Sequence, residues 1–282
     1  MAYLLAIGSA VLYGAADFTG GITTRRGGAG TLPIVILSQA SGLVLLVLLL
    51  PLLPHSSPAR SDLLWGAAAG LTGGIGVALL YRALAIGSMA VVAPTTAVCA
   101  VALPVLVALL LGERPVPLAM AGIALGIASI LLVSRQASPA PDAARSSSGI
   151  GIALASGVAI GLFLLTLSRP KPAAGMWPLV VARGVSVSLF GTAAGITGRS
   201  LRLPPPIAAL ALGGGIMDML ANALYMVAAR MGPLSVVVTL SSLYPASTVL
   251  LARLILGERL NSWQTSGVGC ALAAVVLIVS SR

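Results

Sequence analysis

The feature that most constrains this chain is a series of long apolar runs. A helix needs about 20 mainly apolar residues to cross the hydrocarbon core of a bilayer. Runs of about that length recur along the 282 residues, separated by polar and turn-forming residues. They are 3–23, 31–53, 63–86, 88–111, 116–134, 149–168, 176–198, 207–230, 233–256 and 262–280. The sequence therefore predicts an all-α integral membrane protein with ten transmembrane helices.

The composition agrees with a protein surrounded by lipid. Charged residues make up only 8% of the chain and hydrophobic residues 58%, whereas a soluble domain carries roughly 25% charged residues. This deficit excludes a water-soluble enzyme. The net charge of +10 does not indicate a nucleic-acid partner, because the basic residues are scattered between apolar runs and form no cluster with aromatic residues. The expected surroundings are the lipid bilayer.

An internal repeat divides the chain. A shift of 145 residues without gaps aligns the GER sequence at 112–114 with the GER sequence at 257–259. The same shift aligns Phe18 with Phe163, Pro33 with Pro178, Gly70 with Gly215 and Gly122 with Gly267. We therefore predict a first five-helix repeat at 1–137, a linker at 138–148 and a second repeat at 149–282. Five is odd, so the second copy should cross the bilayer in the opposite sense, as in transporters that work by alternating access.

Glycines spaced four residues apart indicate close helix packing within these repeats. Small residues let the backbones of neighbouring helices approach each other in lipid. Such pairs or triplets occur at Gly66, Gly70 and Gly74, at Gly122 and Gly126, at Gly157 and Gly161, and at Gly191 and Gly195.

The ten spans, the five-span duplication and several local sequences resemble the EamA-type transporters of the drug/metabolite transporter superfamily. The local sequences are LLLGER and LILGER, YGAADFTGGITTRR at 13–26, and the segment around Pro245. The resemblance implies a central cavity lined by spans 1–4 and 6–9, with spans 5 and 10 at the periphery. It also implies a bacterial cytoplasmic membrane with both termini in the cytoplasm. The arginines and lysines do not indicate that orientation, because six would lie inside and seven outside.

Ionisable residues within spans are costly and therefore candidates for function. Asp218 lies in the middle of span 207–230, and Asn222 and Tyr225 follow on the same helix face. We predict that Asp218 binds substrate or carries a coupling proton. Arg82 is a candidate electrostatic partner, because its span is the repeat equivalent of the span that holds Asp218.

Further candidates for substrate binding or coupling lie in four other spans. Asp17 is too far from the helix end for its short side chain to reach the interface easily, whereas the long side chain of Arg183 could reach it. Prolines free backbone carbonyls that can face a cavity. The polar residues near Pro94 and Pro245 are Thr95, Thr96, Ser241 and Tyr244. Glu113 and Glu258 lie at helix ends, where we expect them to cap a helix or to form part of a turn.

The leading functional hypothesis is a secondary transporter that exports or exchanges a small polar or amphipathic metabolite, with protons as a candidate coupling ion. A flippase for a lipid-linked intermediate is the alternative. A membrane-embedded enzyme is disfavoured, because the only histidine, His55, lies in a loop and no cluster of metal ligands is present. We expect no catalytic residues, no bound metal and no cofactor.

Overall fold

The computed structural model describes residues 1–26, 31–86, 89–133, 149–198, 201–256 and 261–281, and the regular structure in these ranges is helical. The helices of the first half are α1 (Ala2–Arg26), α2 (Thr31–Leu49), α3 (Arg60–Ile86), α4 (Met89–Leu110) and α5 (Pro117–Val133). Those of the second half are α6 (Ile150–Leu167), α7 (Trp177–Thr197), α8 (Pro205–Met231), α9 (Leu234–Ser241), α10 (Tyr244–Leu256) and α11 (Ser262–Ser280). The predicted linker at 138–148 lies outside the described residues.

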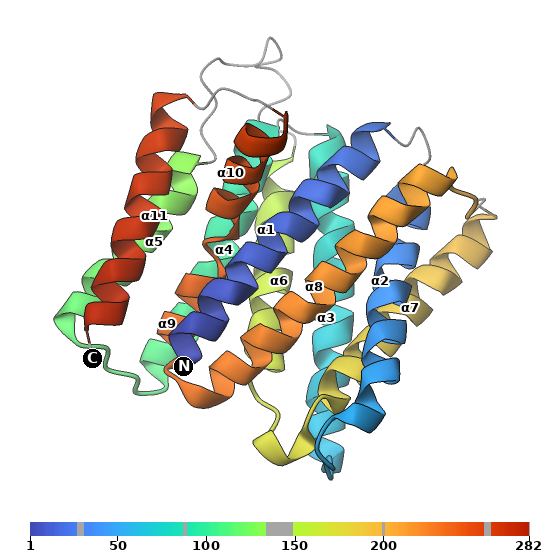
Figure 1. Cartoon of the computed structure of the whole chain (residues 1–282), viewed down its shortest axis with the longest axis horizontal. Helices are drawn as coiled ribbons and strands as arrows, with labels where there is room; N and C mark the ends of the chain where they lie inside the picture. Colours follow the sequence, from blue (N-terminus) through green and yellow to red (C-terminus); the bar gives the residue numbers. More distant parts are fainter. Residues whose placement is uncertain (27–30, 87–88, 134–148, 199–200, 257–260, 282) are drawn as a thin grey trace.

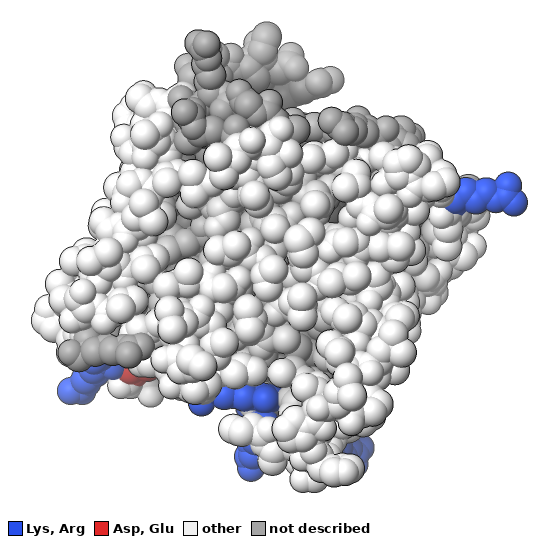
Figure 2. Space-filling view, viewed as in Figure 1, with Lys and Arg blue, Asp and Glu red and all other residues white. Residues whose placement is uncertain are grey.

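The helices run side by side as one bundle (Figure 1). Seven of the described helices are long and apolar enough to cross a membrane, and three shorter apolar helical segments lie at Thr96–Leu110, Pro117–Leu132 and Leu234–Thr248. On the face drawn in Figure 2, the middle of the bundle shows no charged side chain, and basic side chains gather along its lower edge. An uncharged band of this kind suits the hydrocarbon core of a bilayer.

The span predicted at 233–256 is not one continuous helix. It divides into α9 and α10, with a turn at Ser242 and Leu243. Pro245 explains the break, because it has no N–H to donate to the carbonyl of Ser241 one turn earlier. The repeat-equivalent position in α4 is Ala100, which has this N–H, and α4 is continuous.

Helix contacts in the two halves are reciprocal. α1 packs on α8 and α6 on α3, while α2 packs on α8 and α7 on α3. α5 and α11 form a separate pair at the edge of the bundle (Figure 1). In this pair Gly122 of α5 lies against Ala274 of α11, and Ser129 of α5 donates a hydrogen bond of 2.7 Å to the carbonyl of Gly267 in α11. The 145-residue shift maps each of these two contacts onto the other.

Repeat-matched glycines make the closest helix contacts. A methyl group added at Gly70 of α3 would overlap the backbone of Ala182 in α7, and one added at Gly215 of α8 would overlap the backbone of Ser38 in α2. The prediction of close packing is therefore correct for these glycines. It is wrong for Gly191 and Gly195, where an added methyl group would meet nothing within 4 Å. Those two glycines face outward on α7, so their spacing does not mark a contact within the chain.

The end of the bundle that carries both termini (Figure 1) is closed by contacts between the two halves. The carboxylate of Asp62, at the start of α3, accepts a 3.0 Å hydrogen bond from the backbone N–H of Lys171. The N–H of Ser57 donates to the carbonyl of Ala173 at 3.0 Å. Glu113, in the loop after α4, accepts hydrogen bonds from the first N–H groups of α9. Glu113 therefore caps a helix, as predicted, but the helix belongs to the other half of the chain. Glu258 lies outside the described residues.

Candidate functional site

A cavity of about 190 Å³ lies between the two halves of the bundle. Helices α1, α2, α3, α4, α6, α7, α8 and α10 and the end of α9 contribute to its wall, whereas α5 and α11 do not. Its polar lining residues are Tyr13, Asp17, Gln39, Arg183, Ser186, Asp218, Asn222, Ser241, Ser242 and Tyr244. The cavity therefore brings together six of the residues predicted from the sequence, namely Asp17, Arg183, Asp218, Asn222, Ser241 and Tyr244.

A larger groove of about 730 Å³ lies on the outside of the bundle. It is lined by Leu71 of α3 and by one face of α7, and no charged residue contributes to it. Its apolar wall suits contact with lipid chains. The internal cavity is the better candidate for a binding site, because ionisable and hydrogen-bonding groups converge there.

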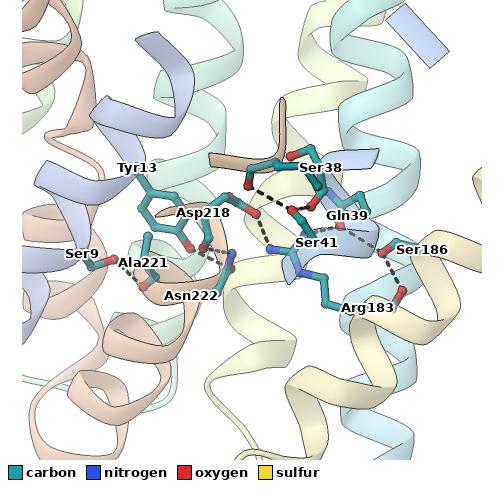
Figure 3. Close-up of polar contacts among 11 residues, drawn as sticks. Ser9, Tyr13, Ser38, Gln39, Ser41, Arg183, Ser186, Asp218, Ala221 and Asn222 are labelled. Atoms are coloured by element: carbon teal, nitrogen blue, oxygen red, sulfur yellow. Dashed lines mark hydrogen bonds and ion pairs between the residues drawn. The ribbon is translucent and has the colours of Figure 1, made fainter. Parts of the chain in front are cut away.

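Arg183 forms the polar centre of the cavity (Figure 3). Its guanidinium donates through one nitrogen to the carboxylate of Asp218 on α8 and through the other to the amide oxygen of Gln39 on α2. The hydroxyl of Ser186, one turn further along α7, also donates to Gln39, at 3.1 Å. The side chain of Arg183 is 9% exposed and that of Asp218 is 29% exposed. Arg183 thus turns into the protein instead of reaching for the interface.

Arg82 was predicted from the sequence as the partner of Asp218. In the structure Arg183 forms an ion pair with Asp218. The side chain of Arg82 lies outside the described residues. Helix α7 carries Arg183 towards α8 because α2 packs against both helices and supplies Gln39 between them. The equivalence of spans between the two repeats could not predict the Arg183–Asp218 pair, since α7 and α8 belong to the same half.

The two halves contribute different chemistry to the cavity. The 145-residue shift places Asp218 opposite Gly73 in the first half, and both residues line the cavity. A methyl group added at Gly73 would lie 2.9 Å from the ring of Phe163. The second half therefore supplies charge at this position, and the first half supplies a glycine packed closely against Phe163.

A second polar connection links α1 to α8. The hydroxyl of Tyr13 donates to the side-chain oxygen of Asn222 at 2.8 Å, and the side-chain amide of Asn222 donates to the carbonyl of Asp218 at 2.7 Å (Figure 3). The ring of Tyr13 meets the ring of Tyr244 edge to face, with centroids 6.2 Å apart. Asp17 lies one turn beyond Tyr13 on α1, is exposed, and lines the same cavity.

The break between α9 and α10 opens onto the cavity. Ser241, Ser242 and Tyr244 surround the break, and all three line the cavity. Ser241 is also held by a 3.4 Å hydrogen bond from its hydroxyl to the carbonyl of Ala6. Discontinuous helices at the midplane form substrate and ion sites in many transporters.

Two predicted residues lie outside the cavity. Thr96 is buried and donates to the carbonyl of Ala153, so it links α4 to α6. Tyr225 is fully buried and donates to the carbonyl of Leu164 at 2.7 Å. Tyr225 shares a helix face with Asp218, but seven residues displace it by about 10 Å along the axis, where its hydroxyl bonds to α6. The side chain of Thr95 lies outside the described residues.

Four polar residues of the cavity wall were not predicted from the sequence, namely Tyr13, Gln39, Ser186 and Ser242. Gln39 is the amide residue within the second apolar run, and Tyr13 lies four residues before Asp17 on the same helix face. Both signals were present in the sequence. Ser186 gave no signal of its own, because serines are common in transmembrane helices and often bond to their own backbone.

Exposure differs between the two ends of the cavity. Asp17 on α1 and Leu80 on α3 lie towards the end opposite the termini; Asp17 is exposed and Leu80 partly buried. Leu179 on α7 and Leu164 on α6 lie towards the end that carries the termini, and they are 1% and 7% exposed. The cavity is therefore more accessible at the end away from the termini.

The comparisons with known proteins agree with this architecture. The sequence matches the EamA-like transporter family twice, over residues 1–135 and again over 147–280. The chain belongs to the EamA-like transporter family. It is therefore an integral membrane protein and a transporter of the drug/metabolite type.

One solved crystal structure resembles this EamA-like protein with a TM-score of 0.78, over 99% of this chain and 98% of its own chain. The two sequences are 16% identical, so this similarity concerns the fold alone. A search of the curated proteins found no match.

Proposed function

We propose that this EamA-like protein is a secondary transporter that exports or exchanges a small polar or amphipathic metabolite by alternating access. The single observation that carries the proposal is the cavity between the two halves, in which Asp17, Arg183 and Asp218 converge. Charged groups within transmembrane helices are expensive and commonly mark a substrate or ion pathway.

The reciprocal helix contacts support the alternating-access part of the proposal. In this proposal residues 1–137 and 149–282 are inverted copies with a linker between them at 138–148. The contact of α1 with α8 has its counterpart in the contact of α6 with α3. A two-fold axis between the copies would produce this correspondence. Two copies related in this way have two equivalent packings, each open to one side of the membrane.

The state of the described structure follows from its two ends. Hydrogen bonds between the halves close the end with the termini, and the cavity is more accessible at the other end. We place both termini in the bacterial cytoplasm, so this state would face outward. A proton is the candidate coupling ion, and Asp218 could accept it when its pair with Arg183 opens.

Cysteine accessibility in reconstituted vesicles tests this mechanism. Cys99 and Cys270 are first replaced by alanine, and single cysteines are then placed at Leu80 or Leu179, which line opposite ends of the cavity. Under conditions that drive the protein between its states, labelling at one position should rise as labelling at the other falls. Simultaneous labelling of both positions from both sides would instead indicate a continuous channel and would refute alternating access.

A further inference from the structure

Asp17 differs from the other charged residues of the cavity because it has no hydrogen-bond or ion-pair partner among the described residues. Among the described residues, Arg183 neutralises Asp218, and no hydrogen bond or ion pair reaches the carboxylate of Asp17. Asp17 lines the cavity and is an exposed residue. A carboxylate within a transmembrane helix is costly unless a positive charge accompanies it.

Among the described residues, the charges of the cavity wall leave one negative charge uncompensated. The charged lining residues are Asp17, Asp218 and Arg183, and the Arg183–Asp218 pair is neutral as a unit. A site with low-dielectric walls and one net negative charge attracts a cation and repels an anion. The expected occupant therefore carries a positive charge next to Asp17.

The groups around Asp17 favour an organic cation. Tyr13 lies one turn away on α1, and Tyr244 packs against Tyr13 with its ring at 63° to the first ring. Aromatic faces attract ammonium groups through their quadrupole. A divalent metal ion would require several oxygen ligands, and no group of three or more acidic, histidine or cysteine side chains occurs among the described residues.

The size of the cavity limits the cation. Its volume of about 190 Å³ is below the roughly 300–1,000 Å³ that is typical of pockets for drug-sized ligands. We propose that Asp17, Tyr13 and Tyr244 form the binding site for the ammonium group of a small organic monocation, and that such cations are the substrate class. This inference rests on the proposed transport function and adds the chemistry of its substrate.

The test is a binding assay on the purified full-length protein in detergent. The probes are choline, tetramethylammonium and propylammonium, with 3,3-dimethyl-1-butanol as the neutral isostere of choline and 3,3-dimethylbutanoate as an anion. Thermal stabilisation reports binding, because a ligand of the folded state raises the melting temperature. At least one cation should stabilise the protein, while the neutral and anionic probes should not.

Variants assign the effect to the proposed residues. Asp17→Asn should abolish stabilisation by the cation, and Asp17→Glu should retain part of it. Asp142→Asn is the matched control, since Asp142 is an acid in the predicted linker at 138–148, and it should retain the full shift. Tyr244→Leu should weaken cation affinity roughly two- to thirty-fold through loss of the ring, whereas Tyr244→Phe should not.

Three results would overturn the inference. They are equal stabilisation by the neutral isostere, unchanged cation binding in Asp17→Asn, and no stabilisation by any of the three cations. If none of the cations binds but Asp17→Asn abolishes proton-driven flux, the cation at Asp17 is a proton, and transport itself stands. If a cation binds but the labelling of Leu80 and Leu179 positions is not reciprocal, the transport mechanism fails and the binding site stands.

Discussion

Arg183 and Asp218 lie 35 residues apart in the sequence and form an ion pair inside the bundle. The pair joins α7 to α8, and through Gln39 it also joins both helices to α2. Since α2 belongs to the first half and α7 and α8 to the second, this centre connects the two parts that move relative to each other in the proposed mechanism.

Asp218→Asn should destabilise the protein and abolish transport. The substitution leaves the buried guanidinium of Arg183 without its counter-charge, and breaking a buried pair in this way costs about 3 kcal/mol. The measurement is the melting temperature of the purified variant together with flux in vesicles. Arg183→Met should also destabilise, but the double variant Asp218→Asn/Arg183→Met should be more stable than the sum of the single effects. Additive effects would show that the two side chains do not interact.

Pro245→Ala should lengthen α9 into α10 and slow transport. Alanine restores the N–H that can bond to the carbonyl of Ser241, and proline costs about 3 kcal/mol inside a helix. We expect slower hydrogen exchange for the amides around residues 241–246, unchanged or higher thermal stability, and flux reduced at least tenfold. Wild-type flux with slowed exchange would show that the break has no role in transport.

Glu113→Gln should weaken the contact between the loop after α4 and the first turn of α9. A carboxylate at a helix N-terminus forms charge-assisted hydrogen bonds, so the loss should be about 1 kcal/mol. The melting temperature measures this effect. Arg114→Gln is the matched control, because Arg114 is the exposed neighbour in the same loop and should leave stability unchanged. An equal loss in both variants would assign the effect to the loop's charge and not to the cap.

Gly215→Ala and Gly191→Ala should have opposite outcomes. The methyl group at residue 215 would overlap the backbone of Ser38, and overpacking of this kind costs about 1–3 kcal/mol. At residue 191 the methyl group meets nothing within 4 Å, so alanine should be neutral or slightly stabilising because it favours the helix. Thermal unfolding in detergent distinguishes the two variants. Similar behaviour of both would contradict the described packing of α8 on α2.

The amino-acid sequence by itself determined the all-α membrane fold and the family. Long apolar runs can satisfy their backbone groups in lipid only as helices, and the GER sequences at 112–114 and 257–259 indicated the duplication. The sequence also identified Asp17, Arg183 and Asp218 as candidates, because the cost of charge in a bilayer is a property of the residue and its depth.

Only the tertiary structure decided which of these residues meet. Arg183 pairs with Asp218, because the packing of α2 against α7 and α8 sets which side chains face one another, whereas the side chain of the predicted partner Arg82 lies outside the described residues. Tyr225 lies on the same helix face as Asp218, yet it is fully buried and its hydroxyl bonds to α6. Periodicity defines the face of one helix, but a cavity depends on where several helices separate, and that is fixed by packing between segments far apart in the chain.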